Sequence, residues 1–181
     1  MSFTKFAVPV VAAFAVLLFS APSASAAGAC TAANASASTA SKRALVRATL
    51  CVLNVERARH RLRPLRLNSR LSEAAQRHSA AMARRNFFSH TSPSGASFVD
   101  RIRSTGYLSG AHSWSVGENI AYGSGSRSTP RSIGRAWMNS PGHRANILSS
   151  SFRSIGIGVA PGTPVGGGSG GTYTTDFGRR S

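Results

Sequence analysis

The order of the periodic segments is the feature that most limits how this chain can fold. Segments in which apolar residues recur at helical spacing come mainly first, and segments in which apolar residues alternate, as in strands, are interleaved late. The helical segments are residues 43–62, 71–86 and 128–140, and the strand-like segments are residues 114–123, 154–160 and 172–178. This order predicts an α+β fold and argues against a succession of βαβ units. We expect the last two strands to form an antiparallel pair.

Capping residues and prolines mark where the helices begin and end. Ser97 opens an S-x-x-D capping box that starts a further short helix. Pro130 follows a threonine cap at the first position of a later helix, which Pro141-Gly142 is predicted to end. In the second helix His78 shares a face with apolar residues, so we expect it to be a hydrogen-bonded packing residue rather than a ligand.

The N-terminal residues have the composition of a secretory signal. They carry Lys5, an apolar run over residues 6–19 and a small-residue cleavage site at residues 24–26. Such a run is too short for the roughly 30 Å core of a bilayer. We therefore expect a signal peptide at residues 1–26, a small-residue linker at 27–42 that does not pack, and one folded domain at 43–181. No transmembrane segment is predicted in the mature chain, which is expected to be secreted or extracellular.

The chain has two cysteines, Cys30 and Cys51. An even number of cysteines in a secreted chain predicts a disulfide, which would tie the N-terminal segment to the first helix and stabilise the fold by roughly 3 kcal/mol. The alternative is lipidation of Cys30, because residues 27–30 resemble a lipoprotein cleavage site. That site normally has leucine where Ala27 stands, so the disulfide is favoured.

The formal net charge is +17, with 22 basic and 5 acidic residues. The basic residues are scattered instead of forming one block, and they are not interleaved with aromatic residues that would stack on bases. No specific nucleic-acid partner is therefore predicted. A basic surface of this kind favours attraction to an anionic envelope polymer.

Three chemically competent side chains lie at the ends of regular segments. His90 in FSHTSP, Glu118 in GENIA and His143 in PGHRANIL each stand near Gly, Pro or Ser, as functional side chains held by a rigid scaffold often do. Two imidazoles and a carboxylate can bind a divalent metal such as zinc, or can act as acid and base around a water molecule. From spacing alone, a structural role in which the three fasten loops is equally compatible.

Taken in order, the motifs of this chain resemble the CAP superfamily, in particular its bacterial secreted SCP-like members. The segments that carry the resemblance are FSHTSP, GENIA, WMNSPGHRANIL, GIGVA and YTTDFG, within residues 50–178. The superfamily groups cysteine-rich secretory proteins, insect venom antigen 5 and plant pathogenesis-related proteins. The resemblance implies an α-β-α sandwich with a small antiparallel sheet between helical layers.

The resemblance also implies a cleft with two histidines and two acidic residues, in which some family members bind a divalent metal. Carried over, His90 and His143 are the candidate metal ligands, and Glu118 is the first acid, expected to hold both imidazoles. The second acid falls on Ser140, so this chain departs from the family pattern and weaker metal affinity is expected. Asn146 completes the candidate ligand cleft. Because a metal needs neutral imidazoles, binding is expected to weaken as pH falls.

Three functions remain open at this point. The leading hypothesis is a secreted binding protein whose cleft takes a ligand such as a lipid or sterol, with or without a metal such as zinc. The second is a hydrolase in which His90, Glu118 and His143 are catalytic, against which count the missing second acid and the lack of a nucleophile motif. The third is a cationic envelope-binding or antimicrobial module. Binding is favoured over catalysis for these two reasons. The ligand itself stays open, because a family resemblance names a fold better than a substrate.

Overall fold

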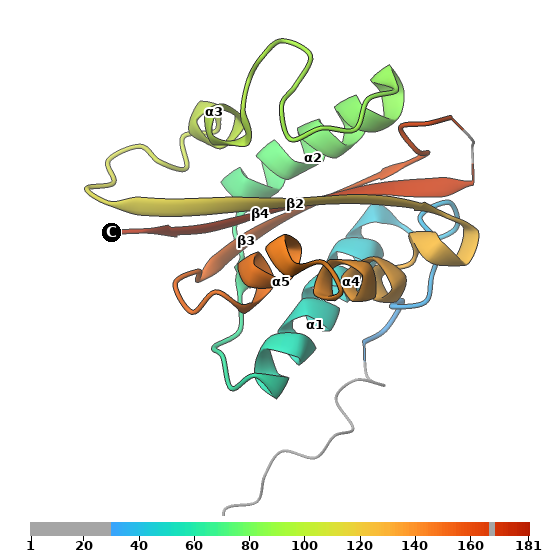
Figure 1. Ribbon diagram of the computed structural model, residues 1–181, viewed down its shortest axis with the longest axis horizontal. Helices are drawn as coiled ribbons and strands as arrows, with labels where there is room; N and C mark the ends of the chain where they lie inside the picture. Colours follow the sequence, from blue (N-terminus) through green and yellow to red (C-terminus); the bar gives the residue numbers. More distant parts are fainter. Residues whose placement is uncertain (1–29, 167–168) are drawn as a thin grey trace, which may run out of the picture.

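The computed structural model describes residues 30–166 and 169–181, and its ribbon is shown in Figure 1. The predicted signal peptide at residues 1–26 lies outside the described residues. The helices are α1 (Lys42–Arg59), α2 (Ser69–Arg85), α3 (Phe98–Ser104), α4 (Pro130–Met138) and α5 (Pro141–Leu148). The strands are β1 (Arg66–Leu67), β2 (Trp114–Ser124), β3 (Ser154–Pro161) and β4 (Gly170–Arg180), and a short 3-10 helix, η2 (Gly125–Ser128), follows β2.

The four strands form one sheet in the order β1-β3-β4-β2. β4 pairs antiparallel with both β3 and β2, which confirms the predicted antiparallel arrangement. β1 is a two-residue strand that runs parallel to β3, and sequence reasoning missed it because two residues show no periodicity. β2 is an outer strand of this sheet, so one of its edges is available to side chains from loops and helices.

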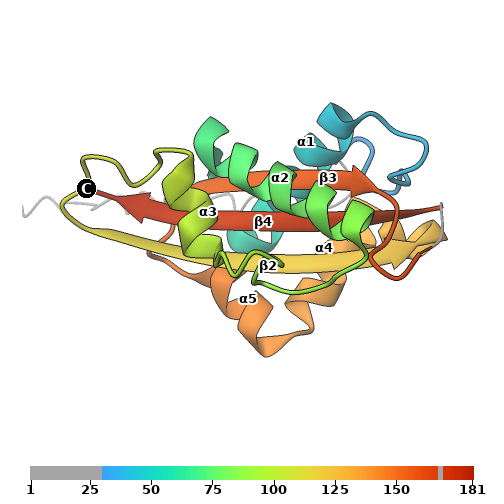
Figure 2. The same cartoon turned by 90° about the horizontal axis from the view of Figure 1, so that it is seen from above.

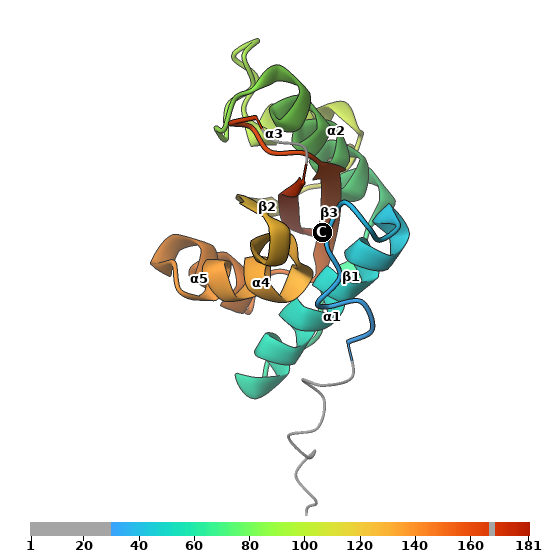
Figure 3. The same ribbon diagram turned by 90° about the vertical axis from the view of Figure 1, so that its right-hand side faces the viewer.

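Helices cover both faces of the sheet. α2 and α3 lie on one face, and α1, α4 and α5 lie on the other (Figures 1 and 3). Seen from above, α2 follows the direction of the strands over β3 and β4 (Figure 2), the two strands with which it makes its main contacts. The predicted α-β-α sandwich is therefore confirmed.

The larger core lies between the sheet and the layer of α1, α4 and α5. Its buried strand residues are Ile155, Ile157, Val159, Tyr173 and Phe177. Trp137 of α4 is buried in the same cluster and donates its indole N–H to the carbonyl of Ile120 in β2 at 3.1 Å. On the opposite face a smaller cluster includes Leu71 of α2 and Ile102 of α3. The alternation of strand side chains thus divides the core between two helical layers.

Two glycines bring the backbones of α2 and β3 into direct contact. A Cβ atom on Gly156 would lie 2.0 Å from the carbonyl carbon of Leu71, and one on Gly158 would lie 2.3 Å from the carbonyl carbon of Ala75. No residue larger than glycine fits at these separations. The glycines of the GIGVA segment therefore set the spacing between helix and sheet.

The described part of the N-terminal segment packs against the domain. The predicted disulfide between Cys30 and Cys51 is present, with Cα atoms 5.7 Å apart, and a sulfur atom in a disulfide is not available to carry a lipid. Ala33 and Ala37 are buried, and the carbonyl of Ala33 accepts a hydrogen bond from the backbone N–H of Arg131 at 2.9 Å. The expectation that this segment does not pack is wrong for residues 30–41, because alanine is small enough to be buried without a large apolar side chain.

Pro141 begins one helix shortly after another has ended. α4 stops at Met138, close to the predicted end, but Pro141 is the first residue of α5, a helix that sequence reasoning did not anticipate. Proline suits this position because the N–H that it lacks has no partner within a helix there. His143 therefore lies in the first turn of α5 and not in a turn that follows α4.

We expect Gly156→Ala to destabilise the fold by about 1–3 kcal/mol or more, because the added methyl group would overlap the backbone of α2. Gly142→Ala is the matched control, since a Cβ at Gly142 meets nothing within 4 Å. Urea unfolding followed by circular dichroism would measure both. Equal stability of the two variants would contradict the close helix–sheet contact.

Candidate functional site

Glu118 is a buried carboxylate in the middle of the outer strand β2. Its side chain is 1% exposed, and both of its oxygens accept hydrogen bonds. Oε1 accepts from Nδ1 of His90 at 2.8 Å, and Oε2 accepts from Nη2 of Arg101 at 2.6 Å. Such partners are required because a buried carboxylate without them is strongly destabilising.

Arg101, in α3, joins Glu118 to the loop that carries His90. Its Nη1 donates to the carbonyls of His90 and Ala96, at 3.0 and 3.1 Å, and to Oγ of Ser92 at 3.1 Å. One guanidinium thus holds residues 90–96 against β2. Sequence reasoning did not identify Arg101, because nothing in its surroundings distinguishes it from the other arginines of the chain.

The bond to Glu118 sets the tautomer of His90. Because the Glu118 carboxylate also accepts from Arg101, it acts as the acceptor and Nδ1 of His90 as the donor. In the neutral form of His90 the lone pair of the imidazole then lies on Nε2, and the His90 side chain is 50% exposed. An oriented imidazole with an accessible acceptor nitrogen is what a metal ligand or a general base requires.

His143 reaches the same part of β2 from α5. Its backbone carbonyl accepts from Nδ2 of Asn119 at 3.0 Å. Nδ2 of Asn146 donates to Oδ1 of Asn119 at 2.9 Å and to the carbonyl of Glu118 at 3.2 Å. Partial burial lowers the pKa of His143, and the charge of His90 lowers it further. The two imidazoles therefore lie within each other's electrostatic field, and we refer to His90, Glu118 and His143 as the imidazole site.

The remaining expectations about this site are met only in part. Ser140 is the N-cap residue of α5, half-buried, and its side chain makes no capping hydrogen bond. Among the contacts of the described residues, the Glu118 carboxylate bonds His90 but not His143. The expectation that Glu118 holds both imidazoles is therefore correct only for His90, while Asn119 and Asn146 fix α5.

Asp176 is a second buried carboxylate next to Glu118, and sequence reasoning missed it. It is 1% exposed and lies directly opposite Glu118 in the pairing of β2 with β4. Its two oxygens have no hydrogen-bond donor among the described residues. Burial raises the pKa of Asp176 well above its usual range, the charge of Glu118 raises it further, and Arg101 opposes the shift. A protonated Asp176 can donate to Glu118, so the pair bears one negative charge and not two.

His78 is a packing residue, as predicted. It is buried in α2, its Nε2 lies 2.9 Å from the carbonyl of Ser89, and its ring meets Phe87 edge to face with centroids 5.8 Å apart. Burial lowers the pKa of His78, which keeps the imidazole neutral at neutral pH. His78 thus supports the start of the loop that carries His90.

The fold is an α-β-α sandwich with a buried glutamate on its outer strand and two imidazoles close to that strand. Comparison with known proteins identifies the class to which it belongs. A model of the CAP family, described as the cysteine-rich secretory protein family, matches residues 50–175. The chain therefore belongs to the CAP family. The matched residues include all three members of the imidazole site.

Two curated relatives come from Bacillus subtilis. The chain is 41% identical over 105 residues to the uncharacterized protein YkwD, and 36% identical over 110 residues to the uncharacterized membrane protein YlbC. These alignments include 58% and 61% of this chain but only 38% and 30% of the relatives, so the chain spans less than two fifths of their length. In the part of this chain that the structure describes, no helix is long and apolar enough to cross a membrane.

Solved structures share the fold. An extracellular protein containing a SCP domain from Bacillus anthracis is 28% identical, with a TM-score of 0.60, over 75% of this chain and 40% of that chain. An outer surface protein from Borrelia burgdorferi has a TM-score of 0.57 over 71% of this chain and 87% of that chain. At 20% identity the second likeness shows the fold alone.

We expect Asp176→Asn to make the protein more stable at pH 7, by about 1.4 kcal/mol for each pKa unit by which the folded protein raises the pKa of Asp176. The unfolded chain releases this proton at lower pH than the folded protein does, so the wild type loses stability as pH rises from about 4. Asparagine does not titrate and keeps a donor for Glu118. Urea unfolding at pH 7 and near pH 4 would measure the difference, which should shrink at the lower pH.

Asp100→Asn is a control of opposite sign. Hydrogen bonds from Ser97 lower the pKa of Asp100, so this carboxylate stabilises the folded protein above its unfolded pKa and loses that effect as pH falls. Its asparagine variant should therefore be less stable than the wild type at neutral pH. A difference for Asp176→Asn that does not change with pH would contradict the protonated state assigned to Asp176.

Proposed function

We propose that this protein is a secreted CAP-domain binding protein whose imidazole site takes a ligand and holds a divalent metal, with zinc as the first candidate. The observation that carries the proposal is the bond from His90 to the buried Glu118. It orients one imidazole, and a second imidazole whose pKa is lowered lies within its electrostatic field. Neutral imidazole nitrogens are good ligands for zinc.

The donor set allows two protein ligands, Nε2 of His90 and the imidazole of His143. Both oxygens of Glu118 already accept hydrogen bonds, so Glu118 acts through His90 in the manner of a carboxylate that orients a ligating histidine. Among the described residues no group of three or more His, Cys, Asp or Glu side chains is arranged to hold a metal. A bound metal would therefore take its other ligands from water or from the bound molecule. We propose a lipid or sterol as that molecule, in line with the family resemblance, and it would bind with the metal in place.

Secretion is supported by two observations from different parts of the chain. The disulfide between Cys30 and Cys51 is of a kind that persists in oxidising compartments. The sequence of residues 1–26 has the pattern of a signal peptide. The similar SCP-domain protein from Bacillus anthracis is described as extracellular.

The hydrolase alternative requires a nucleophile or an activated water next to His90 or His143. Within the described ranges, no serine hydroxyl makes a hydrogen bond to either imidazole, and the second acid of the family pattern is replaced by Ser140. Binding is therefore the better-supported function. Turnover of a peptide or ester panel that disappears in Glu118→Gln would reverse this preference.

We expect the mature, chelator-treated protein to bind one zinc ion near neutral pH. His90→Ala and His143→Ala should each abolish binding, because the two imidazoles are the protein ligands of the proposed site. Glu118→Gln should weaken binding about 10–100-fold, the usual effect of removing the partner of a ligating histidine. Titration calorimetry would measure these affinities.

His112→Ala is the matched control for these variants, because His112 is an exposed histidine outside the imidazole site. It should bind zinc as the wild type does. Urea unfolding of each variant would separate loss of the site from loss of the fold. Zinc binding that survives in both His90→Ala and His143→Ala, or that is absent in the wild type, would show the metal part of the proposal to be wrong.

A further inference from the structure

A positively charged hollow lies near the end of β4, at the end of the sheet marked C in Figure 1. It has a volume of about 520 Å³ and is lined by four arginines, Arg63, Arg153, Arg179 and Arg180, together with Asn68 and Tyr107. The arginines come from the loop after α1, the residue before β3 and the last residues of β4. None of these residues belongs to the imidazole site.

The positive charge of this hollow is not compensated by acidic side chains. Four of the five acidic side chains of the chain are ion-paired elsewhere: Glu56 with Arg59, Glu73 with Arg77, Asp100 with Arg103, and Glu118 with Arg101. The fifth, Asp176, is buried in the sheet. No ion pair among the described residues includes an arginine of the hollow.

Two of the four guanidinium groups are held in place by backbone carbonyls. Arg180 donates through Nη1 to the carbonyls of Tyr107 and Ser109, at 2.9 and 3.2 Å, and its guanidinium lies 5.5 Å from the centroid of the Tyr107 ring. Arg153 donates to the carbonyl of Phe152 at 3.0 Å, and also to that of Ser150. Carbonyl partners orient a guanidinium without neutralising it, and its other N–H groups remain available.

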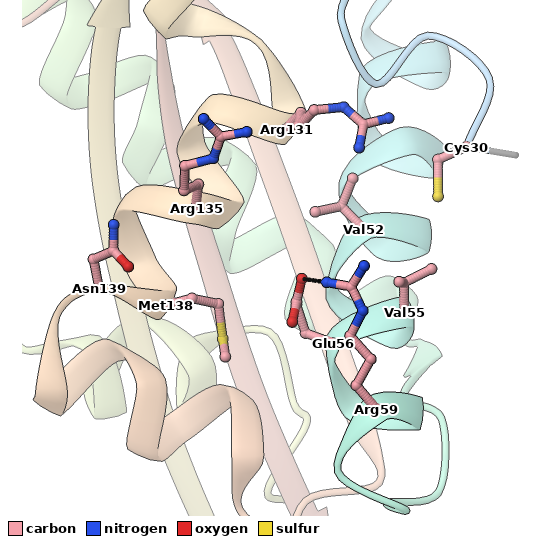
Figure 4. A pocket seen from close by; sticks show the side chains of 9 residues that line it. All are labelled: Cys30, Val52, Val55, Glu56, Arg59, Arg131, Arg135, Met138 and Asn139. Carbon is pink, nitrogen blue, oxygen red and sulfur yellow. Dashed lines mark hydrogen bonds and ion pairs between the residues drawn. The ribbon is translucent and has the colours of Figure 1, made fainter. Parts of the chain in front are cut away.

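A second hollow, between α1 and α4, differs in this respect (Figure 4). It also carries three arginines, but there Glu56 bonds Arg59 at 2.7 Å, and Nε of Arg131 donates to Oδ1 of Asn34 at 2.8 Å. Val52, Val55 and Met138 make part of its wall apolar. Its charge is partly compensated, whereas that of the hollow at the end of β4 is not.

We propose that the hollow at the end of β4 is a binding site for a linear polyanion that carries phosphate groups along its chain. Guanidinium groups recognise phosphate by paired hydrogen bonds, and arginines that approach from three segments suit the tetrahedral oxygens of phosphate better than the planar carboxylate. The volume falls in the range of about 300–1,000 Å³ found for small-molecule sites, which exceeds the needs of one phosphate. More than one phosphate of the same chain therefore fits. This inference does not rest on the imidazole site or its metal.

The test is the binding of long-chain inorganic polyphosphate to the disulfide-bonded protein, followed by fluorescence anisotropy at about 0.1 M salt. Arg63→Glu and Arg179→Glu are the informative variants, because these exposed side chains make no hydrogen bond to the described residues that supports the fold. Arg43→Glu is the matched control. It makes the same change in net charge near the opposite end of α1, roughly 24 Å from the C-terminal end of that helix.

We expect Arg63→Glu and Arg179→Glu each to weaken polyphosphate binding at least about tenfold, and Arg43→Glu to weaken it less than about twofold, because roughly 24 Å exceeds the screening length of about 10 Å. Orthophosphate should bind much more weakly than the polymer, and zinc binding should not change. Equal losses in all three variants would show attraction by net charge alone. Poly-glutamate that binds as tightly as polyphosphate would overturn the preference for phosphate, and orthophosphate that binds as tightly would overturn the linear ligand.

Discussion

The solvation of one buried carboxylate determines the arrangement of the imidazole site. Glu118 lies inside the sandwich on an outer strand, where water cannot satisfy it, so the fold must supply donors. Arg101 and His90 supply them, and Arg101 at the same time binds two carbonyls of the loop that carries His90. The positions of α3 and of this loop, and the outward direction of the His90 acceptor nitrogen, follow from the need to solvate Glu118.

Those parts of the fold that depend on local chemistry could be predicted from the sequence. The capping box at Ser97 and the proline that starts α4 are where the residues predicted them, because caps satisfy backbone groups within a few residues. The alternating segments became β2, β3 and β4, and β3 and β4 are buried along nearly their whole length because helices cover both faces of the sheet. His90, Glu118 and His143 could be selected because each occupies a motif of the CAP family.

The parts that could not be predicted depend on partners far apart in the chain. In the sequence Asp176 is one of several polar residues in a strand-like segment that also contains three threonines, and only the register of β4 with β2 shows that it faces Glu118. Arg101 has no local signal, since its role is set by the carboxylate and carbonyls that surround it. Pro141 is compatible with either the end or the start of a helix. In the structure it starts α5, and Ile147 of that helix is buried in the larger core. The sequence itself offered one sign of Asp176, which is that an acidic residue lies within a strand-like segment of a chain with few acids.

The net charge of Glu118, Asp176 and Arg101 also limits what the imidazole site can bind. With Asp176 protonated, the negative charge of Glu118 is balanced by Arg101, so the cluster is close to neutral before anything binds. Ser140 adds no charge, and the chain as a whole is formally +17. A divalent cation at the imidazoles would therefore meet no excess negative charge from the protein, and the surrounding field would oppose it. A bound molecule with an anionic or oxygen donor would supply both the missing ligands and the missing charge. In such a site the affinities for metal and for ligand are coupled, because each binds more tightly when the other is present.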